Sequence, residues 1–380
     1  MKAALFSAIV LAATLAQGAE QDAVMSDAYW KFWNPEVQAR IDRDIEQNRK
    51  ADGQFKIDAA PGTEVKVEQV SHDFFFGAHI FNFNQLGTTQ RNRKYKELYG
   101  TLFNSATIAF YWKKFEMEPG KPRFEEAQWD TEEYWNNCTD PKNEPHWRRP
   151  ATDPVVEFCE SKGIRLHGHT IIWGNRKWQH PEWLFDQFCP DDEKEKILKL
   201  GKEELAKLTP AEIAELAPVF TREMQRLFEK RVAELAEHYG DRLYSWDVVN
   251  ESATDFAIGA MIPGDAICKS RYGLMPGDYT YAAFKTADRA FPKNVVLKIN
   301  DYRNNNDYTQ QVKDLQARGC RIDVMGSQMH LFNPQQCLDI AAGKPALTPE
   351  SIWSQMETLG KAGLPIHLSE ITITSPGNDE

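Results

Sequence analysis

Short runs of apolar and β-branched residues alternate with longer amphipathic runs from about residue 73 onward. The short runs are typical of buried strands in a parallel sheet, and the longer ones of helices that cover it. We expect strands at residues 73–80, 104–110, 164–172, 243–250, 295–301, 323–328 and 365–370. The clearest helices are expected at 221–239 and 308–318. This alternation predicts a series of βα units that share one parallel sheet.

The first 18 residues have the pattern of a secretory signal peptide. Lys2 is followed by an apolar run from Ala3 to Leu15 and by a small-x-small sequence that ends at Gly18. The apolar run is too short to cross a bilayer. We therefore expect a secreted or periplasmic protein.

Residues 19–70 are expected to form a short extension in front of the main domain. A charged helical pattern covers residues 27–51, with Pro35 near the start of the helix. Two alternating runs, 55–58 and 64–70, lie on either side of a Pro-Gly pair and predict a β-hairpin. A segment of this length can form only a marginal core, and we therefore do not expect it to be an independent binding module.

Two of the predicted strands end on a carboxylate. Residues 243–251 read LYSWDVVNE and end on Glu251, and residues 364–370 read LPIHLSE and end on Glu370. A side chain at such a position is held by rigid backbone but is open to a ligand. Taken singly, either acid is explained equally well as a structural residue that pairs with a surface lysine. Together they are the proton donor and the nucleophile that a retaining glycosidase needs.

The motifs around these acids resemble those of family 10 glycoside hydrolases, which are mostly endo-β-1,4-xylanases. The sequences WDVVNE at 246–251 and IHLSE at 366–370 are similar to the acid/base and nucleophile motifs of that family. Three further motifs have the order and spacing of the family: HGHTIIW at 167–173, INDY at 299–302 and GSQMH at 326–330. The resemblance extends over roughly residues 71 to 375.

The resemblance implies a (β/α)8 TIM barrel over residues 71–380. Seven strands are found in the pattern, and the eighth strand and helix of such a barrel are missing before Glu380. We expect a truncated reading frame, because an open parallel barrel leaves unpaired backbone groups and exposed apolar residues on its outer strands.

The same resemblance assigns roles to individual residues. Glu370 is implied to be the nucleophile and Glu251 the acid/base, with their carboxyl groups roughly 5–5.5 Å apart, the retaining separation. Asn250 is implied to bind the 2-hydroxyl of the sugar. His330 is implied to keep Glu370 oriented and ionised, with Gln328 in the same layer. The resemblance implies no cofactor and no metal.

Other candidate contacts to the sugar are less specific. Lys113 and His169 are implied to line the glycone side of the site. Trp173, on a strand, is explained equally well as core or as part of the site. Trp178 and Trp183, in the following loop, are expected to touch ligand, because sugar rings pack their C–H faces on aromatic rings.

Two departures from the family pattern weaken the assignment of xylan as the substrate. At the end of the second strand, Ala109 and Phe110 stand where the family usually has Glu-Asn, although Lys113 remains. Gly174 follows the tryptophan of the third strand, where the family usually has histidine. Lost hydrogen bonds beside the cleaved bond change which sugar a site prefers.

A zinc site is a rival interpretation of the third strand. His167 and His169 have the spacing with which amidohydrolase barrels begin a metal site. That site would need a histidine from strand five, which has none, and an aspartate from strand eight, which is missing. We therefore interpret His169 as a buried ring that holds neighbouring carboxylates.

Charge and cysteine content narrow the classes of partner. The net charge of −11 argues against nucleic acid and anionic membranes as partners and favours solubility. We expect a monomer. Six cysteines in an exported chain allow up to three disulfides in 15 pairings, which we leave open. The sequence has no Cys-x-x-Cys pair of the kind that zinc ribbons use.

Taken together, the sequence predicts a secreted, retaining β-glycosidase that acts on internal bonds of xylan. Two alternatives stay open. One is a hydrolase of another β-glycan, such as a mixed-linkage glucan. The other is a catalytically inactive carbohydrate-binding protein, against which the presence of both carboxylates argues.

Overall fold

A computed structural model describes residues 35–54, 56–68, 70, 72–200, 204, 208, 212, 215–259, 261, 267–270 and 273–373. The signal peptide expected at residues 1–18 lies outside these residues. The chain divides into two compact units. The larger comprises residues 65–330 and 355–371, and the smaller consists chiefly of residues 35–64 and 331–354.

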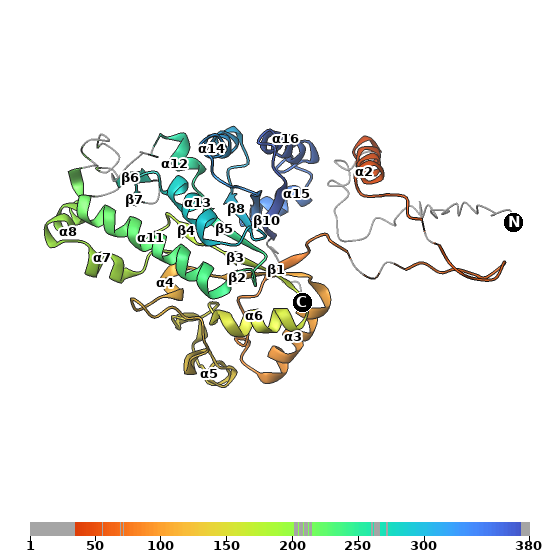
Figure 1. The fold of residues 1–380 in the computed structure, drawn as a ribbon, viewed down its shortest axis with the longest axis horizontal. Helices are drawn as coiled ribbons and strands as arrows, with labels where there is room; N and C mark the ends of the chain where they lie inside the picture. The colour runs from red at the N-terminus through yellow and green to blue at the C-terminus, as the bar shows by residue number, and fades with distance from the viewer. Residues whose placement is uncertain are drawn as a thin grey trace. The chain divides into compact units, whose positions relative to one another are not determined.

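The larger unit is built on one parallel sheet whose strands follow chain order (Figure 1). The strands on this path are β1 (Gly77–His79), β2 (Ser105–Ala109), β3 (Arg165–His169), β5 (Ser245–Asn250), β8 (Val296–Asp301), β9 (Val324–Leu331) and β10 (Ile366–Ile373). The two-residue strand β4 (Ile172–Trp173) also pairs with β5. A separate antiparallel pair joins β6 (Ile267–Ser270) and β7 (Gly273–Pro276). All seven predicted strands are therefore confirmed.

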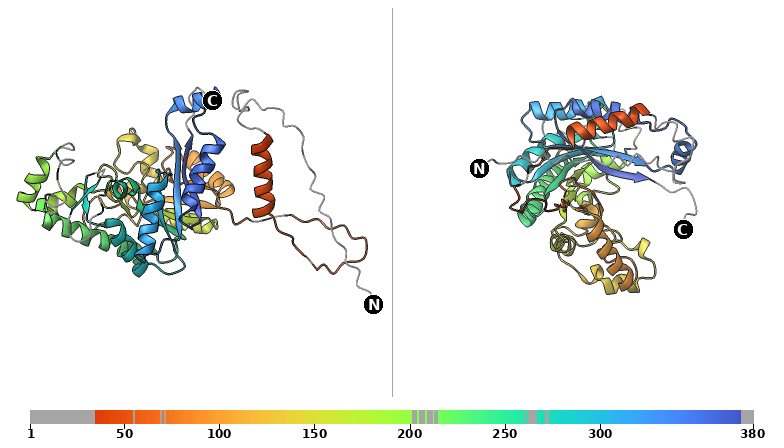
Figure 2. Two further views of the ribbon diagram at one scale, coloured as in Figure 1. Left: turned by 90° about the horizontal axis from the view of Figure 1, so that it is seen from above. Right: turned by 90° about the vertical axis from the view of Figure 1, so that its right-hand side faces the viewer.

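Helices follow most strands and pack along the sheet, as in a TIM barrel (Figures 1 and 2). The longer ones are α3 (Thr89–Leu102), α6 (Thr152–Ser161), α11 (Pro218–Tyr239), α13 (Tyr279–Ala290), α14 (Asn306–Ala317) and α16 (Pro349–Gly360). The shorter ones are α4 (Trp112–Phe115), α5 (Glu132–Asn137), α7 (Glu182–Phe188), α8 (Asp191–Leu198), α12 (Ala253–Ala257) and two 3₁₀ turns at Gln128–Asp130 and Pro141–Asn143.

Helix α11 shows why the apolar pattern predicts these elements well. Its stripe of Met224, Leu227, Phe228, Val232 and Leu235 is buried, as the spacing of three and four residues requires. A proline, tolerated in the first turn, opens the helix, and a glycine with a φ of +55° ends it. The predicted helices at 221–239 and 308–318 are confirmed as α11 and α14.

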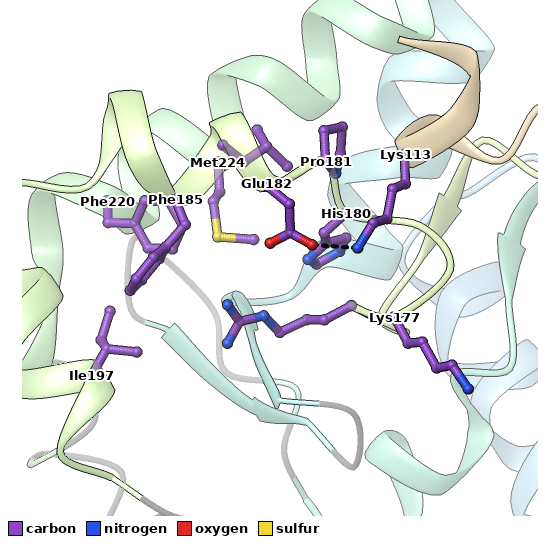
Figure 3. A pocket seen from close by; sticks show the side chains of 11 residues that line it. Lys113, Lys177, His180, Pro181, Glu182, Phe185, Ile197, Phe220 and Met224 are labelled. Atoms are coloured by element: carbon purple, nitrogen blue, oxygen red, sulfur yellow. Dashed lines mark hydrogen bonds and ion pairs between the residues drawn. The ribbon is translucent and has the colours of Figure 1, made fainter. Parts of the chain in front are cut away.

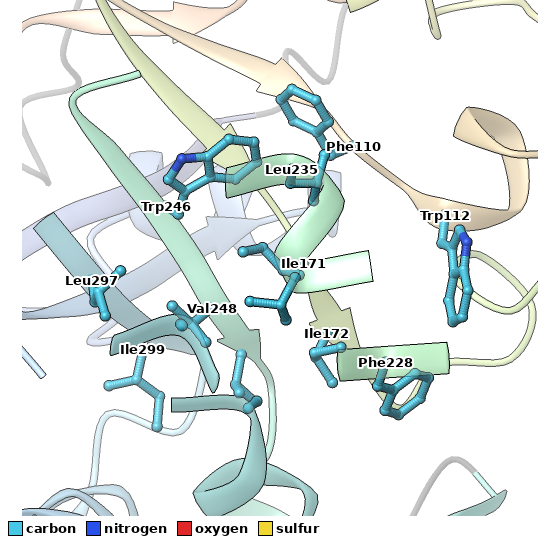
Figure 4. Close-up of a cluster of buried hydrophobic side chains, with 14 of the residues drawn as sticks. Phe110, Trp112, Ile171, Ile172, Phe228, Leu235, Trp246, Val248, Leu297 and Ile299 are labelled. Atoms are coloured by element: carbon cyan, nitrogen blue, oxygen red, sulfur yellow. The ribbon is translucent and has the colours of Figure 1, made fainter. Parts of the chain in front are cut away.

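The apolar core lies between the sheet and the helices, around Trp246 of β5 (Figure 4). Gly168 on β3 lies against the Trp246 ring, and any Cβ at this position would overlap the ring. On the other side, the ring of Phe110 lies 4.6 Å from that of Trp246. Phe110 is fully buried, so it serves the core and cannot bind a sugar.

The predicted β-hairpin in the extension is wrong. No strand is assigned in the described residues 56–68 and 70. A turn does form, in which the backbone N–H of Thr63 donates to Ala60 O at 3.2 Å. The alternating valines Val65 and Val67 are 50% and 70% exposed. Because two strands alone are marginal without apolar surface to cover, the alternating pattern does not suffice here.

The smaller unit contains helix α2 (Pro35–Asn48), helix α15 (Pro334–Ala341) and the start of α16. The helix predicted near Pro35 is confirmed, with Pro35 as its first residue. The guanidinium of Arg40 stacks 3.5 Å from the centre of the Trp353 ring, a cation–π contact within this unit.

Two further observations concern the expected cellular setting. Across the described ranges, every helix is too short or too polar to span a bilayer. Four of the described cysteines are free thiols, namely Cys138, Cys159, Cys189 and Cys320.

Candidate active site

The two predicted catalytic acids lie on or directly after strands of the parallel sheet. Glu251 directly follows β5, and its backbone N–H donates to Asn300 O of β8 at 2.8 Å. Its φ of +56° is uncommon for a residue other than glycine, and such conformations cluster at functional sites. Glu370 lies on β10, and its side chain is 27% exposed. Both carboxylates therefore face the end of the barrel where such folds place their active sites.

Three buried amides connect the two acids. Asn300 Nδ2 donates to Asn250 Oδ1 at 2.9 Å and to Glu370 Oε1 at 2.6 Å. Gln328 Nε2 lies 3.3 Å from both Asn250 Oδ1 and Glu251 Oε1. The oxygen of Asn250 thus accepts hydrogen bonds from both linking amides. This network fixes the acids relative to one another through side chains from β5, β8 and β9.

Two histidines lie against Glu370. His330 Nε2 is 3.1 Å from Glu370 Oε2, and His169 Nε2 is 3.9 Å from Oε1. Burial would raise the pKa of Glu370, but the charge of His169 and the hydrogen bond from His330 outweigh it and lower the pKa below its ordinary value. Glu370 is therefore ionised at neutral pH, as a nucleophile must be.

Behind Glu370 lies a buried chain of alternating charges. Asp247 Oδ2 accepts from His169 Nδ1 and His167 Nε2, both at 2.8 Å, and Lys298 Nζ lies 3.7 Å from its Oδ1. Burial would raise the pKa of Asp247, but the charges of His167 and Lys298 hold it well below its ordinary value. Burial would likewise lower the pKa of His169, but Glu370 and Asp247 raise it. A protonated His169 can thus stabilise the Glu370 carboxylate.

Within the described part of the chain, the same cluster holds the group of side chains that could ligate a metal ion. Ligand atoms of His167, His169 and Asp247 all lie within 4.8 Å of one another. However, both histidines already bond to one oxygen of Asp247, and the ammonium of Lys298 occupies the side of the other oxygen. A cation at this position opposes a divalent metal, which also requires neutral histidines. The contacts favour the interpretation of His169 as a ring that holds carboxylates.

Glu251 has a different set of neighbours. Trp173 Nε1 donates to its Oε2 at 3.1 Å, and Gln328 approaches Oε1. Both of these donors are neutral, whereas those of Glu370 include two histidines. Trp173 is 9% exposed and also packs near Tyr111, so its contact with Glu251 places it in the site. Such unlike environments are how a protein separates the roles of two carboxylates.

Comparison with known proteins identifies the family. A model of glycosyl hydrolase family 10 matches residues 68–380. The chain belongs to this family. Endo-1,4-beta-xylanase A of Halalkalibacterium halodurans is 29% identical over 204 residues, which cover 50% of this chain and 42% of that protein. Endo-1,4-beta-xylanase A of Thermotoga maritima is 26% identical over 318 residues, which cover 80% of this chain and 24% of that protein.

Among solved structures, the crystal structure of xylanase B from Clostridium stercorarium F9 is similar to this chain with a TM-score of 0.50. The two are 21% identical, and the match covers 81% of this chain and 74% of that one. This likeness supports the barrel fold. The chain spans less than half the length of the two curated relatives named above.

Tyr111 is a site residue of this family 10 chain that sequence reasoning missed. It follows β2, and its ring lies 5.5 Å from that of His169. Burial raises the pKa of its hydroxyl, as do the negative charges of Glu370 and Glu251, whereas Arg149 acts in the opposite direction. The guanidinium of Arg149 stacks 4.2 Å from the centre of the ring. Tyr111 thus stands beside the acids, at the strand end where the family's polar pair is replaced.

Three residues that were predicted to contact the sugar instead make contacts with other side chains or with the backbone. Lys113 forms an ion pair with Glu182. Trp178 is 48% exposed, with the ammonium of Lys177 over its ring at 4.8 Å. The expectation for Trp183 is wrong, because its side chain is only 7% exposed and its indole donates to the backbone oxygen of Glu116 at 2.9 Å. It packs in the core because it lies on α7 instead of in the loop.

His330→Leu is expected to change the pH dependence of the family 10 site. An acid with a lowered pKa stays ionised until the pH falls through that lowered value, so the acid limb of kcat/KM should lie below the ordinary pKa of a glutamate. Without the hydrogen bond from His330, the pKa of Glu370 rises and the limb moves to higher pH. We also expect roughly a tenfold loss of kcat, as for one charge-assisted hydrogen bond.

The measurement is a pH profile of kcat/KM for wild type and variant. His72→Leu serves as the control, because His72 is exposed and distant in sequence from both acids. An acid limb that stays in place in His330→Leu would show that His330 does not set the ionisation of Glu370.

Proposed function

We propose that this protein is a retaining glycoside hydrolase that cleaves internal β-1,4-xylosidic bonds of xylan. The observation that carries the proposal is the pair of carboxylates from β5 and β10, joined through Asn250 and held in unlike surroundings. Membership of glycosyl hydrolase family 10 and the names of the relatives support the choice of xylan.

In the first step, Glu370 attacks the anomeric carbon while the bond from that carbon to the leaving oxygen breaks. Glu251 donates its proton to the leaving oxygen, so the departing sugar leaves as a neutral alcohol. The product is a glycosyl ester on Glu370. His169 and His330 hold Glu370 ionised before the attack.

In the second step, Glu251 acts as a base. It removes a proton from water, the water oxygen bonds to the anomeric carbon, and the ester bond to Glu370 breaks. The sugar is released with its original configuration, and Glu251 is protonated again. Each acid therefore returns to its starting state.

Asn250 is positioned to bind the sugar during both steps. Its Oδ1 accepts hydrogen bonds from Asn300 and Gln328, so its amide NH₂ group points the other way. Among the described residues, no partner is recorded for that NH₂ group. We assign it to the 2-hydroxyl of the sugar, where a hydrogen bond strengthens in the transition state.

Another β-glycan is the second candidate substrate, favoured by one observation. Phe110 is in the core, so the polar pair that family members use at this strand end has no counterpart here. Tyr111 and Arg149 stand nearby instead. Reducing-sugar release from xylan, mixed-linkage glucan and cellulose, measured side by side, separates these substrates.

We further propose that the protein is exported and acts as a monomer. The signal-like pattern of residues 1–18 supports export. A polysaccharide substrate is consistent with that setting, because such polymers lie outside the cell.

The stereochemical outcome tests the mechanism directly. Hydrolysis of a xylo-oligosaccharide should give the β-anomer first, because two displacements, first by Glu370 and then by water, each invert the anomeric carbon and together retain its configuration. Proton NMR in the first minutes of the reaction resolves the two anomers before mutarotation mixes them. Initial formation of the α-anomer would mean that water attacks directly and that Glu370 is a base.

A further inference from the structure

Arg149 is a half-buried cation that stands beside the candidate active site. Its guanidinium stacks 4.2 Å from the centre of the Tyr111 ring and lies 5.1 Å from the centre of the Phe81 ring. The Tyr111 ring in turn lies 5.5 Å from that of His169, whose Nε2 is 3.9 Å from Glu370 Oε1. One aromatic ring therefore separates the guanidinium from the residues around the nucleophile.

The protein itself uses little of the hydrogen-bonding capacity of this guanidinium. Its Nη1 donates to the backbone oxygen of Arg148 at 2.7 Å. The N–H groups of Nε and Nη2 have no partner among the described residues, and neither nitrogen is fully enclosed. Burial lowers the pKa of Arg149, and among the described residues only the Tyr111 hydroxyl, not a carboxylate, acts against that shift. Two donors of Arg149 are thus open to a ligand.

The two open N–H groups are the pair that suits a forked contact. Nε–H and Nη2–H lie along one edge of the planar guanidinium and point the same way, so they can donate to two neighbouring oxygen atoms at once. The guanidinium has no acceptor, so both oxygens must accept. Stacking on Tyr111 fixes the plane in which they lie.

The chain around Arg149 is held in place by hydrogen bonds from other segments. Gln85 Nε2 donates to the backbone oxygen of His146 at 3.1 Å, and the backbone N–H of Arg148 donates to Gln85 Oε1. The backbone oxygen of Arg149 accepts from Arg123 Nη1 at 2.9 Å. A side chain on such a pre-organised segment loses less freedom when it binds a ligand.

The residues at the end of β2 do not supply comparable donors. Ala109 has no polar group in its side chain, and Phe110 is fully buried. Lys113 already pairs with Glu182, as Figure 3 shows. Arg149, which comes from the segment before α6, therefore provides open hydrogen-bond donors on this side of the site.

Tyr111 also indicates which sugar unit Arg149 reaches. In the proposed mechanism the attacked sugar lies over Glu370, and the leaving sugar lies toward Glu251. Burial raises the pKa of Tyr111 most, and the charge of Glu370 raises it more than that of Glu251 does. Tyr111 is thus on the side of the nucleophile, and Arg149, stacked on its ring, lies one ring away from the attacked unit.

We propose that Arg149 is a specificity-determining residue that binds two neighbouring hydroxyl oxygens of the second sugar unit on the nonreducing side of the cleaved bond. Nε and Nη2 each donate one hydrogen bond, and Tyr111 holds the guanidinium in place. This inference rests on the proposed function. Because the two open donors of Arg149 lose a partner when either hydroxyl is missing, the site discriminates against such a sugar.

Aryl glycosides with one and with two xylose units test the proposal. With a nitrophenyl leaving group, the kcat/KM of wild type should rise when the second unit is added. Arg149→Met should reduce this gain roughly tenfold to a hundredfold, as for two hydrogen bonds from a charged group. The loss should fall mainly on KM, because these contacts lie away from the reacting atoms. Unchanged kcat/KM on the one-unit xyloside shows that the variant is folded.

Monodeoxy analogues identify the hydroxyls without relying on a variant. The second unit of the aryl xylobioside is replaced by its 2-deoxy, 3-deoxy or 4-deoxy form. In wild type, two neighbouring positions should each lower kcat/KM roughly fivefold to tenfold, and Arg149→Met should lose nothing further at these positions. Arg149→Lys keeps the charge but not the fork, so it should recover only a small part of the gain.

Arg93→Met is the matched control. It removes an exposed positive charge on α3 and should leave the gain from the second unit unchanged. An equal loss on the one-unit and two-unit glycosides in Arg149→Met would overturn the proposal, as would full recovery in Arg149→Lys or a wild type that tolerates every deoxy analogue. A loss confined to chains with acidic substituents would overturn the assignment to hydroxyls. Inactivity of wild type on both glycosides and on xylan would overturn the proposed function instead.

Discussion

Glu370→Gln is expected to abolish turnover on every glycoside, activated or not. The substitution preserves the shape of the side chain but replaces the anionic carboxylate with a neutral amide, which is too weak a nucleophile to form the glycosyl ester. Loss of a covalent nucleophile costs roughly 10⁴-fold or more in kcat. Initial rates on xylan and on an aryl xyloside with a good leaving group measure the effect.

The surroundings of Glu370 make the prediction specific. Asn300, His169 and His330 all point hydrogen-bonding or charged groups at this carboxylate, and a neutral amide cannot use their positive potential. Glu157→Gln, on the exposed face of α6, is the matched control and should keep full activity. Retention of even a few per cent of wild-type turnover in a folded Glu370→Gln enzyme would assign the nucleophile elsewhere.

The strands and main helices could be predicted because burial leaves a simple mark on the sequence. A strand covered on both faces is buried along nearly its whole length and is rich in large apolar residues, as β5 and β8 are. A helix with one buried face repeats its apolar residues every three or four positions, as α11 does. The hairpin predicted from residues 55–58 and 64–70 is wrong because its apolar residues are not covered. Alternation predicts a strand only where something covers its apolar face, and Val67 is 70% exposed.

The acids could be predicted because each follows a run of residues that forms a strand, although β10 continues past Glu370 to Ile373. Their supporting residues were harder to find, since each depends on contacts between distant strands. Asp247 and Lys298 are polar residues inside apolar runs, a signal that the sequence offers but that does not reveal the partner. In the structure they lie 3.7 Å apart, and Asp247 contacts both histidines of β3. Only the parallel register of β3, β5 and β8 brings them together.

The sequence does not predict which aromatic side chains face the active site and which belong to the core. Trp173 and Trp183 are both tryptophans near the same loop, yet one contacts Glu251 and the other belongs to the core. Phe110 and Tyr111 are neighbours in sequence, but the former packs on Trp246 and the latter lies beside His169. Which ring faces a ligand depends on where the strand ends, to within one residue, and composition does not specify that.

Glu251→Ala should act selectively, in contrast to Glu370→Gln. Without a proton donor, cleavage of xylan should fall by roughly 10²- to 10⁴-fold, the usual contribution of general acid catalysis. A dinitrophenyl glycoside needs no proton on its leaving oxygen, so the first step should proceed at nearly the wild-type rate. The second step also loses its base, so the glycosyl ester on Glu370 should accumulate. A burst of phenolate, followed by slow turnover, is the expected time course.

Mass spectrometry of the intact protein during the slow phase checks the intermediate directly. The Glu251→Ala chain should gain the mass of one glycosyl group, and peptide mapping should place the group on Glu370. Glu157→Ala is the control and should show neither burst nor added mass. Glu251 lies directly after β5, and its removal leaves the buried residues of that strand in place, so the fold should persist. If Glu251→Ala loses xylan and the activated glycoside to the same extent, Glu251 is not the proton donor.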